Sequence, residues 1–171
     1  MTAARLAGAT ALPLALLTLA FAGSALAAPS RLGEADVRGL VERQSRAWNA
    51  GDLTSYFATF SPTARFTDQA LGNDNRIVPY GVSTLAQARA QSRRTLAAGK
   101  VREAVTVDAI TVAPDGRSAR LSARAVSDIT RAGVARRVCA RRIETFELTP
   151  AGPRASGQTD TIVRCRPGAV G

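Results

Sequence analysis

Residues 48–68 read WNAGDLTSYFATFSPTARFTD, and this stretch contains the end of one helix, a second short helix and the start of an extended segment. Gly51 suits the C-terminus of the first helix, and Asp52 can cap the second, because its carboxylate accepts a hydrogen bond from a free backbone N–H. The apolar residues of the second helix are spaced helically at Leu53, Tyr56, Phe57 and Phe60. Ser61-Pro62 is expected to end that helix, and residues 65–68 are predicted to be extended.

Amphipathic helices are predicted on both sides of this stretch. Residues 31–50 carry Val37, Leu40, Val41, Ala47 and Trp48 at helical spacing, with Ser30 available as the N-terminal cap. A third helix is predicted from about Ser83 to Ala98, after a loop at residues 72–75, and Gly99 would close it.

The second half of the chain has the alternation of β-strands. Short turn sequences at residues 114–116, 131–133 and 149–155 separate runs of β-branched and small residues. The sequence therefore predicts an α+β domain in which three N-terminal helices pack on a curved, mostly antiparallel sheet of four to six strands. An apolar cavity is expected between the two layers.

Length and composition exclude several classes of protein. The 171 residues suit one domain, and the chain has no histidine and only two cysteines. It therefore cannot build a histidine-based catalytic triad or a structural zinc cluster by itself. The acidic residues Asp68, Asp74 and Glu144 lack the spacing of metal ligands, so we expect neither a metal nor another cofactor.

The first 27 residues have the pattern of an export signal. Arg5 precedes an uncharged apolar run over residues 6–22, and small residues follow up to an A-x-A site that ends at Ala27. The alternative is a membrane anchor, but the run is shorter than the ~20 residues that a span needs, and Pro13 interrupts it. We expect residues 28–171 to form a single mature domain in the periplasm or outside the cell, with no membrane span after cleavage.

An oxidising compartment favours a disulfide between Cys139 and Cys165. If residues 138–148 and 156–165 form a hairpin around the turn at 149–155, a register with Leu148 opposite Ser156 also places the two cysteines opposite each other. The alternative is two independent buried thiols. A redox-active C-x-x-C pair is absent.

The order of these features resembles the nuclear transport factor 2-like superfamily. The resemblance rests on residues 48–52, the short helix, Phe60, the segment 64–68 and Gly81 before the third helix, and it extends from about Val37 to Arg164. The superfamily includes the SnoaL-like polyketide cyclases and the ketosteroid isomerases. The resemblance implies a cone-shaped barrel with a pocket between helices and sheet, frequently in a homodimer, and it does not imply one function.

The same resemblance suggests three catalytic candidates. Asp68 matches the general base of the ketosteroid isomerases, which moves a proton at a carbon next to a carbonyl. The oxyanion-binding positions fall near Gln44 and Glu144, which differ from the tyrosine and aspartic acid of those enzymes. Each residue also has a structural interpretation: Asp68 as a turn residue, and Glu144 as a member of a cross-strand ion pair.

Four aromatic residues are candidates for contact with a ligand: Trp48, Tyr56, Phe66 and Tyr80. The first three have helix or strand spacing that is more typical of core residues than of a ligand-binding surface. Tyr80 lies next to Pro79 and Gly81 at the start of the third helix, where we expect it to reach the mouth of a pocket.

The chain is strongly basic, with a formal net charge of +10 that becomes +9 when Arg5 is removed with the signal. Six arginines gather on segments that we expect to be adjacent strands: Arg136, Arg137, Arg141, Arg142, Arg164 and Arg166. Few aromatics and no recognition motif accompany them, so we do not expect nucleic acid as a partner.

The sequence therefore supports two hypotheses. In the first, the chain is an exported domain that binds a small apolar molecule, with isomerase or lyase chemistry through Asp68 as the enzymatic form of that function. In the second, it is a non-catalytic module that dimerises or binds an anionic partner through an arginine-rich sheet face.

Overall fold

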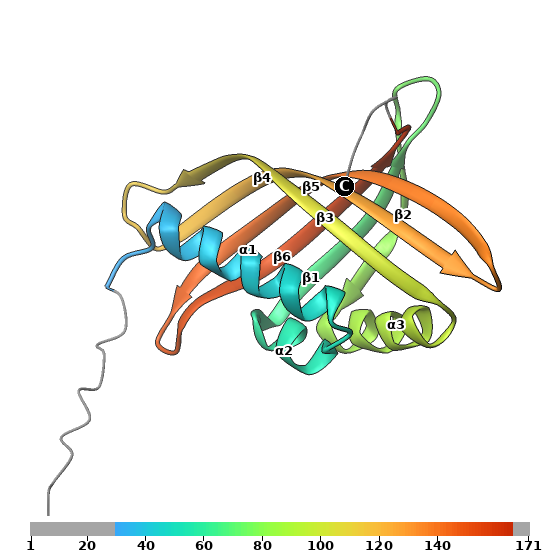
Figure 1. Cartoon of the computed structure of the whole chain (residues 1–171). Helices are drawn as coiled ribbons and strands as arrows, with labels where there is room; N and C mark the ends of the chain where they lie inside the picture. Colours follow the sequence, from blue (N-terminus) through green and yellow to red (C-terminus); the bar gives the residue numbers. More distant parts are fainter. Residues whose placement is uncertain (1–29, 166–171) are drawn as a thin grey trace, which may run out of the picture.

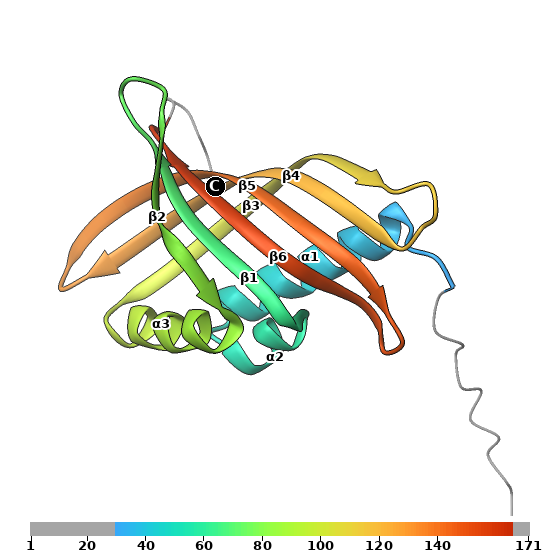
Figure 2. The same cartoon turned by 180° about the vertical axis from the view of Figure 1, so that it is seen from behind.

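The computed structural model describes residues 30–165, which fold into three helices and six strands. Their order along the chain is α1 (Glu34–Asn49), α2 (Leu53–Ala58), β1 (Phe60–Leu71), β2 (Ile77–Thr84), α3 (Leu85–Ala97), β3 (Lys100–Val112), β4 (Ser118–Arg131), β5 (Val134–Thr149) and β6 (Gly152–Val163). The predicted signal segment, residues 1–27, lies outside the described residues. In Figures 1 and 2, all three helices lie on one side of the curved sheet.

The six strands form one sheet in the order β2-β1-β6-β5-β4-β3. The β1–β6 pair is parallel and the other four pairs are antiparallel. The predicted α+β class and mostly antiparallel sheet are confirmed. The sheet is open, with β2 and β3 at its edges, so the predicted closure into a cone-shaped barrel is not confirmed.

The helices begin where side chains satisfy their free backbone N–H groups. The Asp36 carboxylate accepts the Gly33 N–H at 2.8 Å, so α1 begins after Gly33 instead of after the predicted cap Ser30. Asp52 caps α2 as predicted, accepting the Ser55 N–H at 3.0 Å. Thr84 caps α3 in the same way.

The N-terminal strands are longer than their sequence pattern indicates. Helix α2 ends at Ala58, before the predicted stop at Ser61-Pro62, and β1 then begins at Phe60. Pro62 is accommodated near the start of this strand, where the β1–β6 register shifts between Phe60 and Arg65 and leaves backbone groups unpaired.

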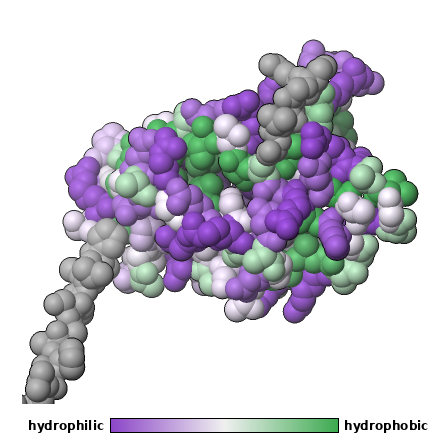
Figure 3. Space-filling view, in the orientation of Figure 1, coloured by the Kyte–Doolittle hydropathy of each residue, from purple (hydrophilic) through white to green (hydrophobic). Residues whose placement is uncertain are grey.

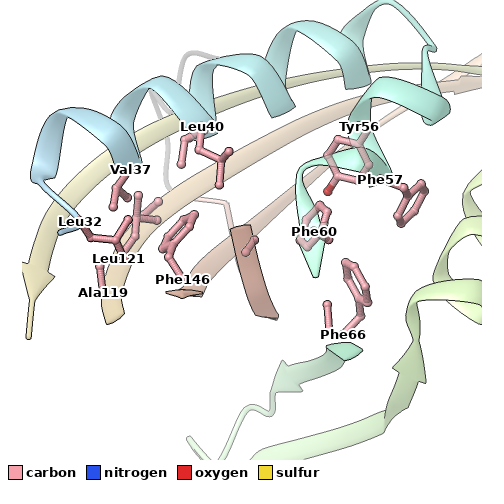
Figure 4. Packing of buried hydrophobic residues seen from close by; sticks show 14 residues of the cluster. Leu32, Val37, Leu40, Tyr56, Phe57, Phe60, Phe66, Ala119, Leu121 and Phe146 are labelled. Carbon is pink, nitrogen blue, oxygen red and sulfur yellow. The ribbon is translucent and has the colours of Figure 1, made fainter. Parts of the chain in front are cut away.

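Apolar side chains from both layers form one core. Val37 and Leu40 of α1 pack over Leu121 and Phe146 of the sheet, as Figure 4 shows. A second part of the core is aromatic, and it lies where α2 meets β1. Its members are Tyr56, Phe57, Phe60 and Phe66, with ring centroids 4.9–6.1 Å apart.

The β5–β6 hairpin carries the disulfide. Cys139 and Cys165 are bonded, with their Cα atoms 5.2 Å apart, which confirms the predicted pairing. The predicted register is wrong, because Cys139 lies opposite Val163 and Leu148 lies opposite Pro153. The chain reverses over residues 150–151, since Gly152 adopts a φ of +98° that permits a tight turn, and the seven-residue turn that we predicted does not form.

The surface is largely polar on the face shown in Figure 3, where hydrophobic residues form separate patches. Among residues 30–165, no helix is long and apolar enough to cross a bilayer.

Candidate ligand-binding site

A pocket of about 190 Å³ opens between the helices and the sheet. Every helix and five of the six strands contribute to it. The lining residues are Trp48, Tyr56, Phe57, Phe66, Asp68, Ser83, Ala88, Gln91, Ser92, Thr95, Glu103, Arg142, Gln158 and Asp160. The pocket is therefore mixed in character, with an aromatic wall and a charged floor, and it is not the apolar cavity that the sequence suggested.

The space exists because α3 presents small and polar side chains to the sheet. The helix has no buried residue, and its pocket-lining side chains are Ala88, Gln91, Ser92 and Thr95. These positions follow the i, i+3, i+4, i+7 spacing of one helical face. Large apolar residues at the same positions would fill the gap, as they do beneath α1. The helical spacing of this polar stripe is visible in the sequence, although the candidate site residues predicted from the sequence did not include it.

The aromatic wall comes from the C-terminal end of α1, from α2 and from the middle of β1. The rings of Trp48 and Tyr56 are tilted by 52° with centroids 5.2 Å apart, and Tyr56 meets Phe57 edge to face at 5.0 Å. Phe57 in turn meets Phe66 at 6.0 Å. These rings serve both the core and the pocket, so the two alternatives that the sequence left open apply together.

The charged floor is an ion-pair network centred on Arg142 of β5. Its guanidinium donates to both Glu103 carboxylate oxygens at 2.9 and 3.1 Å and to both Asp160 carboxylate oxygens at 2.8 and 3.0 Å. Arg142 is buried, and its two carboxylate partners keep its pKa well above the usual range against the opposing effect of desolvation. Each partner comes from a different strand, so the network ties β3, β5 and β6 together.

Two further polar groups extend this network toward the aromatic wall. Gln158 Nε2 donates to Asp160 Oδ2 at 2.8 Å. The Tyr56 hydroxyl donates to Gln158 Oε1 at 3.3 Å, and burial raises the pKa of this phenol, which stays protonated. The polar atoms of the floor therefore satisfy one another.

Asp68 stands at the rim of the pocket with an exposed side chain. It lies opposite Asp160 in the β1–β6 ladder and opposite Gly81 in the β1–β2 ladder. Partial desolvation raises the pKa of its carboxyl group, Asp160 raises it further, and Arg142 opposes both effects. Within residues 30–165, no hydrogen bond or ion pair to this carboxylate is found, in contrast to the other two acids of the pocket.

The other two catalytic candidates do not line the pocket. Gln44 and Glu144 are both buried, and Gln44 Nε2 donates to Glu144 Oε1 at 2.6 Å. Burial raises the pKa of Glu144 to about 7, and the hydrogen bond from Gln44 limits the rise. The two side chains therefore form a closed hydrogen-bonded pair within the core, away from the pocket.

Tyr80 lies outside the pocket, on the edge strand β2, with 64% of its surface exposed. The β1–β2 register shifts next to Asp68, and Tyr80 is the extra residue at this bulge. A bulge turns a side chain away from the alternation of its strand. The expectation placed Tyr80 at the entrance of the third helix, but α3 begins at Leu85 and Tyr80 belongs to strand β2.

The six arginines do not gather on one face. Arg142 points into the pocket floor, whereas its neighbour Arg141 is exposed on the opposite side, because successive strand residues alternate. Arg137 pairs with Asp128, and Arg164 donates to Asn73. Arg166 lies outside the described residues. The predicted continuous arginine face is therefore divided between the two sides of the sheet.

One buried polar atom in the described part of the chain lacks a partner, the indole nitrogen Nε1 of Trp48. An unpaired buried donor is uncommon in folded proteins. Residues 30–165 contain no group of three or more His, Cys, Asp or Glu side chains arranged to hold a metal ion.

Known proteins share the fold but little sequence. No family model and no curated protein matches the chain. A ketosteroid isomerase-like protein from Erwinia carotovora atroseptica superimposes with a TM-score of 0.61 at 9% identity, covering 77% of this chain and 96% of its own. An NTF2-like protein of unknown function in nutrient uptake from Rhodospirillum rubrum gives a TM-score of 0.60 at 19% identity, covering 75% and 99%.

A third structure, an NTF2-like protein with a cystatin-like fold from Novosphingobium aromaticivorans, gives a TM-score of 0.53 at 19% identity, covering 79% of this chain and 84% of its own. The chain therefore has the fold of the nuclear transport factor 2-like superfamily. At these identities the likeness defines the fold alone, and the function has to be argued from the pocket.

Proposed function

We propose that the chain is an exported small-molecule-binding protein whose ligand occupies the pocket between α3 and the sheet. The observation that carries this proposal is the pocket itself, which combines an aromatic wall with a carboxylate, Asp68, that has no protein partner among the described residues. Ligand sites in proteins typically pair apolar walls with a few polar groups of this kind.

The pocket volume limits the size of the ligand. A sealed cavity of about 150 Å³ holds one benzene molecule, and drug-sized ligands occupy about 300–1,000 Å³. A pocket of about 190 Å³ therefore suits a molecule with one ring and a short substituent. A steroid is too large unless α3 moves away from the sheet.

Isomerase or lyase chemistry is a second candidate function, favoured by the state of Asp68. A carboxylate with a raised pKa and no hydrogen-bond partner is suited to accept a proton from a bound substrate. The reaction also needs a donor for the developing oxyanion. Gln44 and Glu144 do not line the pocket, so the amide of Gln91 or Gln158 would have to serve.

Export is supported by the pattern of residues 1–27 and by the disulfide, since such bonds persist in oxidising compartments. We propose cleavage after Ala27 and a periplasmic or secreted mature domain of residues 28–171. The mass of the exported protein tests this: it should match a chain that begins at Ala28 and contains no free thiol. A product that retains residues 1–27 would contradict it.

The alternative function is a partner-binding module, and the predicted homodimer is one form of it. Exposed apolar residues lie along β2 and could pack against a second copy: Ile77, Val78, Tyr80 and Val82. The division of the arginines between two faces weighs against one large anion-binding surface.

The test of the proposed function is a ligand screen of residues 28–171 with one-ring compounds of varied polarity. Binding raises the melting temperature, and Trp48, the one tryptophan of the chain, reports on the pocket through its fluorescence. A compound that changes both signals, and loses affinity in Ser92→Leu, supports the proposal. A broad library without any such compound would contradict it and favour the partner-binding module.

Catalysis is tested on the compounds that bind. For each one, turnover or deuterium exchange in D₂O is measured with the native protein and with Asp68→Asn. Exchange that Asp68→Asn abolishes would support proton transfer, whereas binding without exchange would support a binding protein.

A further inference from the structure

The pocket carries more negative than positive charge. Its ionisable lining residues, apart from the protonated Tyr56, are three carboxylates and one guanidinium: Asp68, Glu103, Asp160 and Arg142. Arg142 is bidentate to both Glu103 and Asp160, so four of its five N–H groups are already used within the network. An anion entering the pocket would therefore meet carboxylates without gaining a free cation.

Asp68 is the pocket acid that takes no part in the ion-pair network of Arg142. It lies next to Asp160 in the ladder between two parallel strands, and no hydrogen bond or ion pair of the described residues uses it. Two carboxylates on adjacent strands repel each other, and a positive charge placed between them relieves that repulsion. Asp68 lies at the rim, where a ligand enters, and Asp160 belongs to the charged floor.

The aromatic wall also favours a positively charged ligand. Trp48, Tyr56 and Phe66 line the same pocket as the acids, and the faces of aromatic rings attract cations within about 6 Å. A ring on the ligand can pack against the same wall while its charged end faces the rim.

The positive net charge of the whole chain does not cancel this local preference. Several exposed arginines lie on the side of the sheet away from the helices, for example Arg124 and Arg141. At physiological salt the Debye length is about 8 Å, so exposed charges beyond that distance are largely screened.

We propose that the pocket selects a small organic cation, an ammonium group on a short apolar chain that ends in one ring, with the ammonium beside Asp68 and Asp160 and the ring against Trp48. This inference rests on the small-molecule-binding function proposed above and names the class of its ligand. An ammonium at Asp68 assigns that residue a role in binding.

The test uses three probes that differ mainly in charge: 2-phenylethylammonium, 2-phenylethanol and phenylacetate. Affinities for residues 28–171 are measured by calorimetry at pH 7.5, where the amine is protonated. We expect the ammonium to bind about fivefold or more tightly than the alcohol, and the carboxylate to bind weakest, since an exposed ion pair and a cation–π contact each contribute up to about 1 kcal/mol. Equal or tighter binding of the alcohol or the carboxylate would overturn the inference.

Two variants test whether Asp68 causes the preference for the ammonium over the alcohol. Asp68→Asn should reduce the ratio of ammonium to alcohol affinity by at least about threefold, because the ion pair is lost while the aromatic wall and the pocket shape are kept. Asp74→Asn removes the same charge from the β1–β2 loop, where Asp74 is exposed and does not line the pocket, and should keep the native preference. A preference that Asp68→Asn leaves undiminished, or that Asp74→Asn also reduces, would overturn the assignment.

The two proposals fail differently. If no member of the series binds at millimolar concentration, the inference on ligand class is wrong. The proposed binding function fails only if the broad library also contains no ligand. Melting temperatures of both variants within a few degrees of the native value verify that the comparison is between folded proteins.

Discussion

Arg142 is the residue whose removal should damage the fold most. It is buried with 8% of its surface exposed, and it forms ion pairs with both Glu103 and Asp160. In Arg142→Ala both carboxylates lose their partner, and breaking a buried pair in this way costs about 3–5 kcal/mol of unfolding free energy. Urea denaturation measures the loss.

Arg141→Ala is the matched control, since Arg141 is the next residue of the strand and is exposed. We expect it to change stability by no more than about 0.5 kcal/mol. Equal losses in the two variants would mean that the buried network does not contribute as described.

The raised pKa of Glu144 predicts how the stability of the fold changes with pH. Burial raises its pKa from 4.5 to about 7, so the folded state holds a proton that the unfolded state releases. The contribution of this proton to the free energy of unfolding is fully present below pH 4.5 and is lost as the pH rises through about 7. The facing groups are Gln44, Arg142, Asp160 and Glu103, and the net effect is on the order of 3 kcal/mol.

Urea unfolding at pH 5 and pH 7.5 measures this effect. The native protein should lose more stability between the two values than Glu144→Gln, which keeps a hydrogen-bonding side chain and does not titrate. Parallel pH profiles for the two proteins would contradict a protonated Glu144. The raised pKa of Asp68 contributes with the same sign and is present in both proteins.

Individual site residues were predictable only where the sequence itself indicated a role. Asp68, Trp48, Tyr56 and Phe66 were chosen by motif and spacing, and all four line the pocket. Glu103 and Asp160 were missed because their importance comes from a contact with Arg142 across separate strands. Sequence distance hides such a contact until the strand register is known.

At the scale of elements, helix α3 determines whether a pocket exists. Ser92→Leu places an apolar side chain in the gap between α3 and the sheet. We expect ligand affinity to fall at least tenfold, with unchanged or increased thermal stability, because the new side chain occupies the ligand's place and buries apolar surface. Calorimetry with 2-phenylethylammonium and a thermal melt give the two readings.

Ala86→Leu adds the same side chain at an exposed position of α3 and should leave binding unchanged. If Ser92→Leu binds as well as the native protein, the ligand site lies elsewhere.

The disulfide fastens the end of β6 to β5. Its two cysteines are 26 residues apart, and closing a loop of this length stabilises the fold by about 3–4 kcal/mol in the chain-entropy model. Reduction should therefore lower the melting temperature of the native protein. The double variant Cys139→Ala/Cys165→Ala should melt at the lower temperature and be insensitive to reductant. A native protein that is indifferent to reductant would contradict this contribution.

Elements were predictable where local signals are strong, and registers were not. Apolar spacing located α1 and α2, the Asp52 cap marked the start of α2, and the flanking turn residues located α3, each to within a few residues. The β5–β6 register differed from the prediction because the tight turn at Gly152 and the bulge at Thr145–Phe146 shift the pairing, and neither has a clear signal in the sequence. The parallel β1–β6 pair joins segments about 90 residues apart, which strand patterns alone do not reveal.

At the scale of the whole molecule, charge is distributed unevenly. The chain carries a formal net charge of +10, whereas carboxylates outnumber guanidinium groups in the pocket. Total charge suggested an anionic partner, and the local arrangement favours a cationic ligand. The net charge of the chain therefore did not indicate the charge of the pocket, because basic residues on the outer surface dominate the total.

The central claim is that the pocket under α3 binds a small molecule, and Trp48 gives the most direct test of it. The indole N–H signal of the one tryptophan is followed by nuclear magnetic resonance in ¹⁵N-labelled residues 28–171 during titration with 2-phenylethylammonium and 2-phenylethanol. The account predicts a saturable shift of this signal that is lost in Ser92→Leu. Binding measured by calorimetry that leaves the Trp48 signal unmoved would contradict it.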